Sequence, residues 1–298
     1  MTKSTEQKVF EYGGLLLILF TVFFGCAAKK PSWGDPKTGF ILNYRLAPGQ
    51  ILAYHTTTKQ STNMEMMGQP IDVETDILFN YSLKGIGSDE QKNILTEITL
   101  DTASITANSP QGKQTFDLSS LIGKNFGLTL SPMGEELQYS GIDSLPEIDF
   151  GQMSGGKRDA KSFFVNPFPN LPQNPIRIGE TWTDKGERTM PQGNMEITVK
   201  TESKNIIEKL EIMDSVECLK INSQSTGTLD GEGQQMGMDM VFEGDLESTT
   251  TWYFAYKKGI FVKMTSEQFV EATIAVSGQT SMTIPLTQET NTEIRLSY

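Results

Sequence analysis

Methionine is the residue type whose number and spacing could do specific chemistry in this sequence. The chain of 298 residues has 14 methionines. The most closely spaced ones lie in two clusters, with a further one near the end of the chain: Met64, Met66 and Met67; Met236, Met238 and Met240; and Met282. Alternate residues of a strand point to the same face, so Met64 and Met66 would line one face, as would Met236, Met238 and Met240. Thioethers can bind Cu(I), line an adaptable mouth for a lipid, or fill gaps in a core.

The other chemistry-bearing residues do not form a catalytic pattern. His55 is the only histidine, so serine triads, histidine-rich zinc sites and most general-base schemes lack a required residue. The 37 Asp and Glu residues include no pair that stands out from the polar faces of strands. Residues 230–233 alternate carboxylates with glycines but lack the spacing of a calcium loop, so we expect a turn there. We therefore expect no enzyme activity, no metal site and no cofactor.

The composition limits the partners of the chain. Its formal net charge is −12 at pH 7, and an acidic surface repels phosphate backbones and anionic head groups. We expect no nucleic-acid partner and no docking to a membrane through charge alone. Hydrophobic residues make up 37% of the chain, which is compatible with a packed globular protein.

The N-terminal residues have the pattern of an export signal. Two lysines precede an apolar run, Leu15–Phe24, which is followed by Gly25 and Cys26. This pattern resembles a bacterial lipoprotein signal, in which the cysteine is lipidated and becomes the first residue of the mature protein. The alternative is an uncleaved anchor over residues 12–28, which is at the short end for a membrane span.

The resemblance implies a signal peptide over residues 1–25 and lipidation at Cys26. The prolines and glycine at Pro31, Gly34 and Pro36 indicate a short tether, which we place over residues 26–39. Because Ala27 rather than Asp follows the cysteine, the resemblance also implies sorting to the outer membrane, with the protein facing the periplasm. Lipidation of Cys26 would leave Cys218 without a disulfide partner. We expect Cys218 to be a buried, unreactive thiol in a strand.

A long alternation of apolar and polar residues runs through residues 51–83. A two-residue turn at Gly68-Gln69 would pair Met67 with Pro70 and place His55 on the polar face. The other face would carry Leu52, Tyr54, Thr56, Thr58, Gln60, Thr62, Met64 and Met66 from the first arm, and Ile71, Val73, Thr75, Ile77, Phe79, Tyr81 and Leu83 from the second. The alternation predicts a half-buried antiparallel hairpin.

A similar hairpin is expected near the C-terminus, after a three-residue loop at 257–259. A three-residue turn that begins at Gly278 would set these residues against each other: Val276 and Met282, Ile274 and Ile284, Ala272 and Leu286, Met264 and Ile294, and Val262 and Leu296. Gly49 and Gly68 lie 19 residues apart, as do Gly259 and Gly278. This spacing predicts that the second half of the chain repeats the first.

These patterns divide the chain into three parts after the tether: a first β half at 40–145, a Gly/Pro-rich connection at 146–178 and a second β half at 179–298. In the second half, strands are expected at 194–201, 205–212, 216–228 and 236–251. A short helix is expected over 118–124, after Asp117. The predicted fold is mainly all-β. Two related halves of long, twisted antiparallel strands would form a curved sheet, half-barrel or barrel with one or two short helices.

The leader, the long strands and the Gly-Glu-Thr-Trp run at 179–182 resemble an uncharacterised group of bacterial envelope lipoproteins. The architecture resembles the lipoprotein-localisation-factor superfamily, which implies an open β half-barrel that holds acyl chains. We therefore expect a membrane-anchored protein that binds a hydrophobic ligand or lipid. The candidate ligand-binding residues are Met64, Met66, Ile71, Val73, Phe79, Met236, Met238, Met240, Val276 and Met282. The alternatives are a structural or interaction subunit of an envelope complex, and Cu(I) binding through the methionines.

Overall fold

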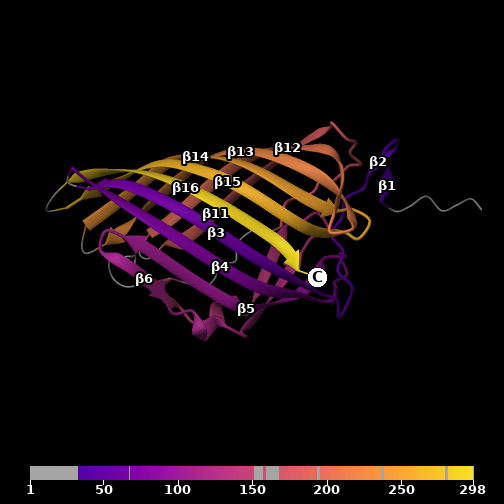
Figure 1. Cartoon of the computed structure of the whole chain (residues 1–298), viewed down its shortest axis with the longest axis horizontal. Helices are drawn as coiled ribbons and strands as arrows, with labels where there is room; N and C mark the ends of the chain where they lie inside the picture. Colours follow the sequence, from indigo (N-terminus) through magenta and orange to yellow (C-terminus); the bar gives the residue numbers. More distant parts are fainter. Residues whose placement is uncertain are drawn as a thin grey trace, which may run out of the picture. The chain divides into compact units, whose positions relative to one another are not determined.

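Long antiparallel strands dominate the computed structural model (Figure 1). The structure describes residues 33–66, 68–150, 157–158, 168–192, 195–235, 238–278 and 281–297, all within the folded unit Trp33–Tyr298. Twelve strands form one sheet in the order β11-β12-β13-β14-β15-β16-β3-β4-β5-β7-β8, with β6 beside β5. The predicted all-β fold is confirmed.

The sheet is built from two runs of strands along the chain. The first run is β3 (Ile51–Met66), β4 (Gln69–Ser88), β5 (Ile94–Ser109), β6 (Gly112–Phe116), β7 (Asn125–Leu130) and β8 (Glu136–Ser140). The second run is β11 (Thr181–Gln192), β12 (Met195–Met213), β13 (Val216–Gln235), β14 (Met238–Ala255), β15 (Ile260–Ser277) and β16 (Met282–Ser297). The last strand of the second run, β16, pairs with the first strand of the first run, β3.

The smaller elements are two short strand pairs and two single helical turns. These are β1 (Gly34–Asp35) with β2 (Gly39–Phe40), β9 (Ile148–Asp149) with β10 (Lys157–Arg158), η1 (Ser119–Leu121) and η2 (Ile142–Ser144). The predicted helix over 118–124 is therefore only the turn η1. Asp117 Oδ1 accepts the Ser119 N–H at 2.9 Å at its start. In the described part of the chain, no helix is long and apolar enough to cross a membrane.

The two predicted halves share one continuous sheet. The β16–β3 pairing extends from Leu286 with Met64 to Ser297 with Ala53. The strands expected at 194–201 and 205–212 are parts of the single strand β12, which bends at a register shift between Ile207 and Lys209. That the second half repeats the first stays a prediction.

The predicted pairing of residues is correct in the C-terminal hairpin and wrong in the N-terminal one. In the C-terminal hairpin, four predicted pairs are confirmed: Val276 with Met282, Ile274 with Ile284, Ala272 with Leu286, and Met264 with Ile294. In the N-terminal hairpin, Met66 pairs with Gln69 and Met64 with Ile71, so the predicted register was wrong by two residues. Gly68 has φ +76°, a left-handed backbone conformation that glycine adopts readily. A shift of two keeps every side chain on its predicted face.

The loop between β14 and β15 is one residue longer than predicted. Ala255 pairs with Ile260, and the Ala255 carbonyl accepts the N–H groups of Lys258 and Gly259 at 2.9 and 2.8 Å. Gly259 has φ +71°, the left-handed conformation expected for it.

The end of the sheet at which β3 begins is called the base below, and the opposite end, at Gly68 and Gly278, is called the tips. At the base, residues 40–46 and 168–176 cross the inner face. The Tyr44 ring lies 5.2 Å from that of Phe254 and 5.7 Å from that of Phe168, and the Tyr44 hydroxyl donates to the Pro169 carbonyl at 2.9 Å. The expected connection over 146–178 therefore packs into the core through its described part.

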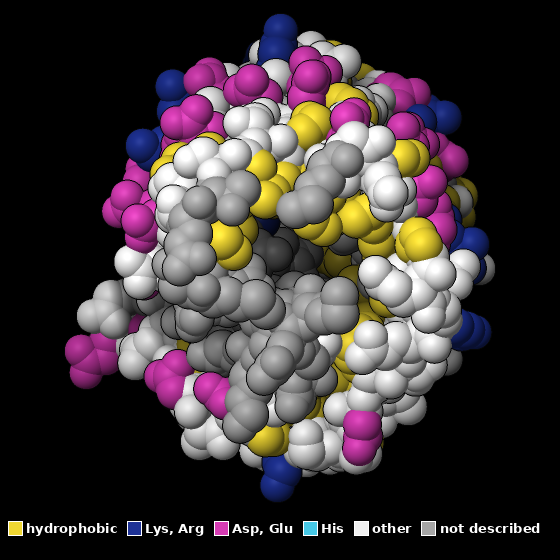
Figure 2. Space-filling model, turned by 90° about the vertical axis from the view of Figure 1, so that its left-hand side faces the viewer, with side chains coloured by type: hydrophobic (Ala, Val, Ile, Leu, Met, Phe, Trp, Pro, Cys, Tyr) yellow, Lys and Arg dark blue, Asp and Glu magenta, His cyan; other side chains and the backbone are white. Residues whose placement is uncertain are grey.

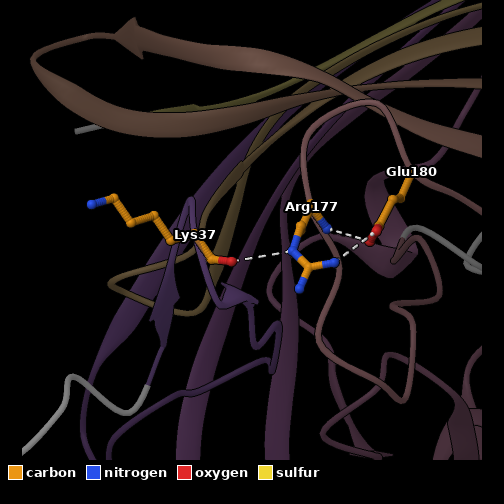
Figure 3. Close-up of polar contacts among 3 residues, drawn as sticks. All are labelled: Lys37, Arg177 and Glu180. Carbon is orange, nitrogen blue, oxygen red and sulfur yellow. Dashed lines mark hydrogen bonds and ion pairs between the residues drawn. The ribbon is translucent and has the colours of Figure 1, made fainter.

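Part of the predicted tether is folded. Asp35 Oδ1 accepts the N–H groups of Lys37 and Thr38 at 2.7 and 2.9 Å, which closes the β1–β2 turn. Residues 33–39, the last part of the predicted tether, therefore belong to the folded unit. Figure 3 shows Arg177, whose Nε donates to the Lys37 carbonyl at 3.2 Å and whose guanidinium and backbone N–H contact the Glu180 carboxylate.

Replacing Phe168 tests whether the 168–176 segment holds the base together. Phe168 is 6% exposed, so Phe168→Ala should lower the free energy of unfolding by about 3–5 kcal/mol, the usual cost of a buried Phe→Ala change. Chemical denaturation measures this. The control Ile178→Ala, at a residue that is 42% exposed, should change it by less than about 1 kcal/mol. Equal small losses in both variants would contradict the role given to this segment.

Candidate functional site

The inner face of the sheet near the tips is mainly apolar, with Thr62 and Gln288 as polar residues in the row of Val270 next to the belt. Antiparallel register aligns inward residues across strands, as in the rows Met282–Val276–Met240 and Ile284–Ile274–Phe242–Gly231–Ile197. We call these inward residues the tip zone: Met64, Met66, Ile71, Val73, Met195, Ile197, Val199, Leu229, Met238, Met240, Phe242, Leu246, Val270, Ala272, Ile274, Val276, Met282, Ile284 and Leu286. Six of them form a buried cluster of their own: Ile197, Val199, Phe242, Leu246, Val270 and Ala272.

The inner face becomes polar halfway between tips and base. Two successive rows there consist of uncharged polar residues on six strands: Gln60–Thr290–Gln268–Ser248–Ser225–Ser203 and Thr58–Thr292–Ser266–Thr250–Ser223–Asn205. We call these twelve residues the hydroxyl belt. Cross-strand hydrogen bonds link several of them, for example Thr58 with Thr292 at 3.1 Å and Thr250 with Ser266 at 2.8 Å.

On the base side of the belt, the inner face is apolar again. The next row is Phe79–Thr56–Ile294–Met264–Trp252–Ile221–Ile207, in which Thr56 is the one polar residue. Tyr54, the next inward residue of β3, donates its hydroxyl to the Phe261 carbonyl at 2.9 Å. The base core leaves a cavity of about 20 Å³, which Tyr44, Leu52, Leu83 and Phe168 help to line. That volume holds about one water molecule.

Two hydroxyls at the boundary between belt and base are buried without a hydrogen-bond partner among the described residues. They are Thr56 Oγ1 and the Tyr81 hydroxyl. Tyr81 pairs with Tyr54, and Thr56 pairs with Phe79, so the two are diagonal neighbours on adjacent strands and share the inner face. Burial raises the pKa of Tyr81 strongly, with a smaller contribution from the Glu136 carboxylate, so its hydroxyl stays protonated.

Charged groups on the inner face lie near the two ends of the strand order. Arg188 of β11 is half-buried, and burial lowers its pKa while the nearby Glu136 carboxylate raises it. Tyr139 donates its hydroxyl to Glu136 Oε2 at 2.5 Å. Asp184 accepts a hydrogen bond from Asn170 Nδ2 at 2.8 Å. The charge of Arg188 is therefore offset by that of Glu136, and the carboxylates of Glu136 and Asp184 accept hydrogen bonds.

The outer face of the long strands is polar and charged. On β14 and β15 it carries Asp239, Glu243, Asp245, Glu247, Lys263, Glu267 and Glu271, each one residue away in sequence from an inward residue. Charged side chains are seldom placed against hydrocarbon. The outer face is therefore suited to contact with water.

Most of the predicted ligand-binding residues come together in the tip zone. Met64, Ile71, Val73, Met238, Met240 and Met282 are half-buried, Val276 is buried and Met66 is 37% exposed. Phe79 is an exception, because it is 8% exposed and packs in the base core. It lies eight residues from Ile71 along β4 and is therefore not part of the tips. Met236 and the predicted lipidation site Cys26 lie outside the described residues.

Figure 2 views the folded unit from the tips. The surface is hollowed at this end, and hydrophobic side chains gather around the hollow. Partly exposed methionines of the tip zone, such as Met66 and Met282, come from hairpin ends that lie there. The half-buried methionines of the tip zone are therefore apolar side chains that a ligand can reach from solvent, whereas the six residues of the buried cluster are covered.

The register does not favour a thioether metal site. Val276 lies between Met240 and Met282, and Leu286 lies beside Met64. Within the described strand pairs, no two methionines face each other. Cu(I) needs several soft ligands around one point, so this arrangement gives that alternative no support.

Two further residues singled out in the sequence lie where the alternation places them. His55 is on the outer face, with its Nδ1 2.5 Å from Asn80 Oδ1. Cys218 is a free thiol, fully buried in β13, and burial raises its pKa to about 11. A thiol with a raised pKa is a poor nucleophile at neutral pH, in agreement with the expected unreactive cysteine.

Comparisons with known proteins identify no family. No protein-family model matches the sequence, and no curated protein matches it. Among solved structures, OccK2 (OpdF) of Pseudomonas aeruginosa covers 84% of this chain and 99% of that chain at 8% identity, with a TM-score of 0.31. OmpT, an outer membrane protein of Vibrio cholerae, covers 86% of this chain and 99% of that chain at 6% identity, with a TM-score of 0.17. At such low TM-scores, neither similarity supports a conclusion about the fold or the function of this chain.

The burial of Cys218 predicts a loss of stability at alkaline pH. The thiol ionises at its ordinary pKa of 9.0 in the unfolded chain but only at about 11 in the folded protein. A pKa that folding raises favours the folded state fully below pH 9, and this contribution is lost as the pH rises to 11. The loss should reach about 2 kcal/mol at pH 10.5 and about 2–3 kcal/mol above pH 11. Urea denaturation between pH 8 and pH 10.5 measures it.

The control for this experiment is Cys218→Val, which keeps a small apolar side chain and removes the ionisable group. It should lose less stability than the parent protein over the same pH range. Raised tyrosine pKa values act in the same direction in both proteins, so only the difference between them reports on Cys218. Identical pH dependences would contradict the assignment.

Proposed function

We propose that this protein is a non-enzymatic lipoprotein of the bacterial cell envelope that binds a hydrophobic ligand or lipid in its curved sheet. In this proposal Cys26 carries the lipid anchor, and the folded unit faces the periplasm from the outer membrane. The observation that carries the binding role is the tip zone, an apolar inner face with half-buried methionines at the hollowed end of the sheet (Figure 2).

The binding region is assigned to the tip zone because the base is filled. The base core packs large side chains such as Tyr54, Trp252 and Phe254, and its cavity of about 20 Å³ is too small for an acyl chain. In the tip zone, inward residues of β15 from Val276 to Val270 are apolar. Six residues of strand span about 20 Å, somewhat more than the hydrocarbon thickness of one membrane leaflet, about 15 Å.

The outer face and the predicted anchor fit the same role. A charged outer face favours a unit that stays in water beside the membrane. Lipidation at Cys26 would hold that unit near lipids, because each buried CH₂ of an acyl chain contributes about 0.8 kcal/mol. The resemblance to the lipoprotein-localisation-factor superfamily belongs to the same proposal.

The alternative function is that of an interaction subunit of an envelope complex. The edge strand β11 favours it, because among the described strands β11 pairs with β12 alone along Thr181–Gln192. An unpaired strand edge can accept a strand from another protein. A stable protein partner, recovered together with a tip zone that binds no ligand, would support this alternative.

A polar substitution in the tip zone tests the binding role. Met240→Gln keeps the length of the side chain but places an amide on the apolar inner face. It should weaken binding of the apolar fluorescent probe N-phenyl-1-naphthylamine about threefold to tenfold. The lower figure corresponds to the binding free energy that one buried methylene contributes, about 0.8 kcal/mol. Fluorescence titration of the folded unit measures the dissociation constant.

The matched control is Val241→Gln on the next residue of β14. Val241 is 43% exposed and points to the outer face, so its replacement should leave probe binding unchanged. If the parent protein does not bind the probe, or if both variants bind it equally well, the proposed binding site is wrong.

Substitution of Cys26 tests the anchor separately. Cys26→Ser in the full chain should remove incorporation of labelled palmitate and move the protein from the membrane fraction to the soluble fraction, because the serine cannot form the thioether that carries the lipid. Cys218→Ser is the control and should keep both the label and the membrane location. Retention of label in the Cys26 variant would contradict lipidation at this residue.

A further inference from the structure

The polarity and partial exposure of the hydroxyl belt indicate the chemical class of the ligand. Its residues point to the inner face. Gln60, Thr290 and Gln268 on β3, β16 and β15 are half-buried, whereas Asn205 and Ser223 on β12 and β13 are buried. Inward side chains at the base, in contrast, are almost fully covered. Space therefore remains in front of the belt at β3, β15 and β16, deeper in the sheet than the tip zone.

Two hydroxyls beside the belt have unused hydrogen-bonding capacity. Thr56 Oγ1 and the Tyr81 hydroxyl are buried and have no partner among the described residues. Leaving a buried hydroxyl unpaired costs free energy, and native proteins seldom do so without a reason. Both hydroxyls belong to inward side chains that are diagonal neighbours on β3 and β4, directly below the belt row that begins at Thr58.

The belt selects against charge. Its twelve residues on β3, β12, β13, β14, β15 and β16 are all uncharged. The inward Arg188 lies near the oppositely charged Glu136, so this end of the sheet offers no single uncompensated charge. A charged group moved out of water into this setting would lack a partner. An alcohol or an ester would find donors and acceptors.

We propose that the ligand is an amphiphile with an acyl chain and an uncharged, hydroxyl- or ester-bearing head group. The head group binds at the belt beside Thr56 and Tyr81, and the chain extends through the tip zone toward the tips. From Gln60 to Met66 is six residues of strand, about 20 Å, which accommodates an acyl chain. This inference rests on the proposed function, since it requires that the tip zone binds a chain.

A displacement experiment tests the head-group preference. The parent protein is loaded with N-phenyl-1-naphthylamine, and monooleoylglycerol, oleate and octadecene compete for the site. These compounds share a long chain and differ in the head group: neutral, anionic and absent. Monooleoylglycerol should displace the probe at a concentration at least about threefold lower than either of the others.

Two near-isosteric variants locate the head group. Thr56→Val and Tyr81→Phe each remove one hydroxyl and keep the shape of the side chain. Each should weaken monooleoylglycerol about threefold to tenfold, the effect of one hydrogen bond, and leave octadecene and the probe unchanged. Melting temperatures should stay equal or rise, because an unpaired buried hydroxyl is lost. Thr57→Val, on the outer face, is the control and should change nothing.

The outcomes separate this inference from the function on which it rests. If the probe does not bind, the proposed function itself is wrong. If the probe binds but the three competitors act equally, or if both variants bind monooleoylglycerol as the parent does, the apolar site stands and the head-group inference is overturned.

Discussion

The alternation of side chains along antiparallel strands is the constraint on which the rest of this structure depends. Each long strand sends alternate residues to opposite faces. The pairing from β11 to β4 keeps that assignment, apart from register shifts at Ile207/Lys209 and at Tyr253/Phe254. Charged residues thus collect on the outer face, and the inner face acquires three zones: apolar at the tips, polar in the middle and apolar at the base. A shift of one residue in any pairing would exchange the faces.

The face of the sheet to which each residue points could be predicted from the sequence. Which residue pairs with which across two strands could be predicted only where one register matched apolar residues and its competitor did not. Val276 faces Met282 as predicted, because the competing register would have set apolar residues against Ser281 and Thr283. At Gly68 two registers that differ by two residues satisfy the same alternation, and glycine fits either position of a two-residue turn. The packing of Phe168 against Tyr44 joins residues far apart in the sequence, and no local pattern specifies it.

The candidate site was predicted in part for the same reasons. The methionines at the tips could be placed because turns and alternation are local signals. Phe79 was assigned to the site by parity alone, but its depth along β4 puts it in the base core. The hydroxyl belt was missed, although Thr56, Thr58 and Gln60 were assigned to the inner face. Only the register across strands shows that Thr290, Ser266 and Ser225 continue the same rows.

The central claim is that the inner face near the tips holds an acyl chain, and native mass spectrometry of the full-length protein released gently from membranes tests it most directly. The account predicts a noncovalent adduct with the mass of a neutral lipid, in addition to any mass attached at Cys26. The adduct should disappear on mild activation and be depleted in Met240→Gln but not in Val241→Gln. A protein that carries no noncovalent lipid, under conditions in which a known lipid-binding protein keeps its ligand, would contradict the account.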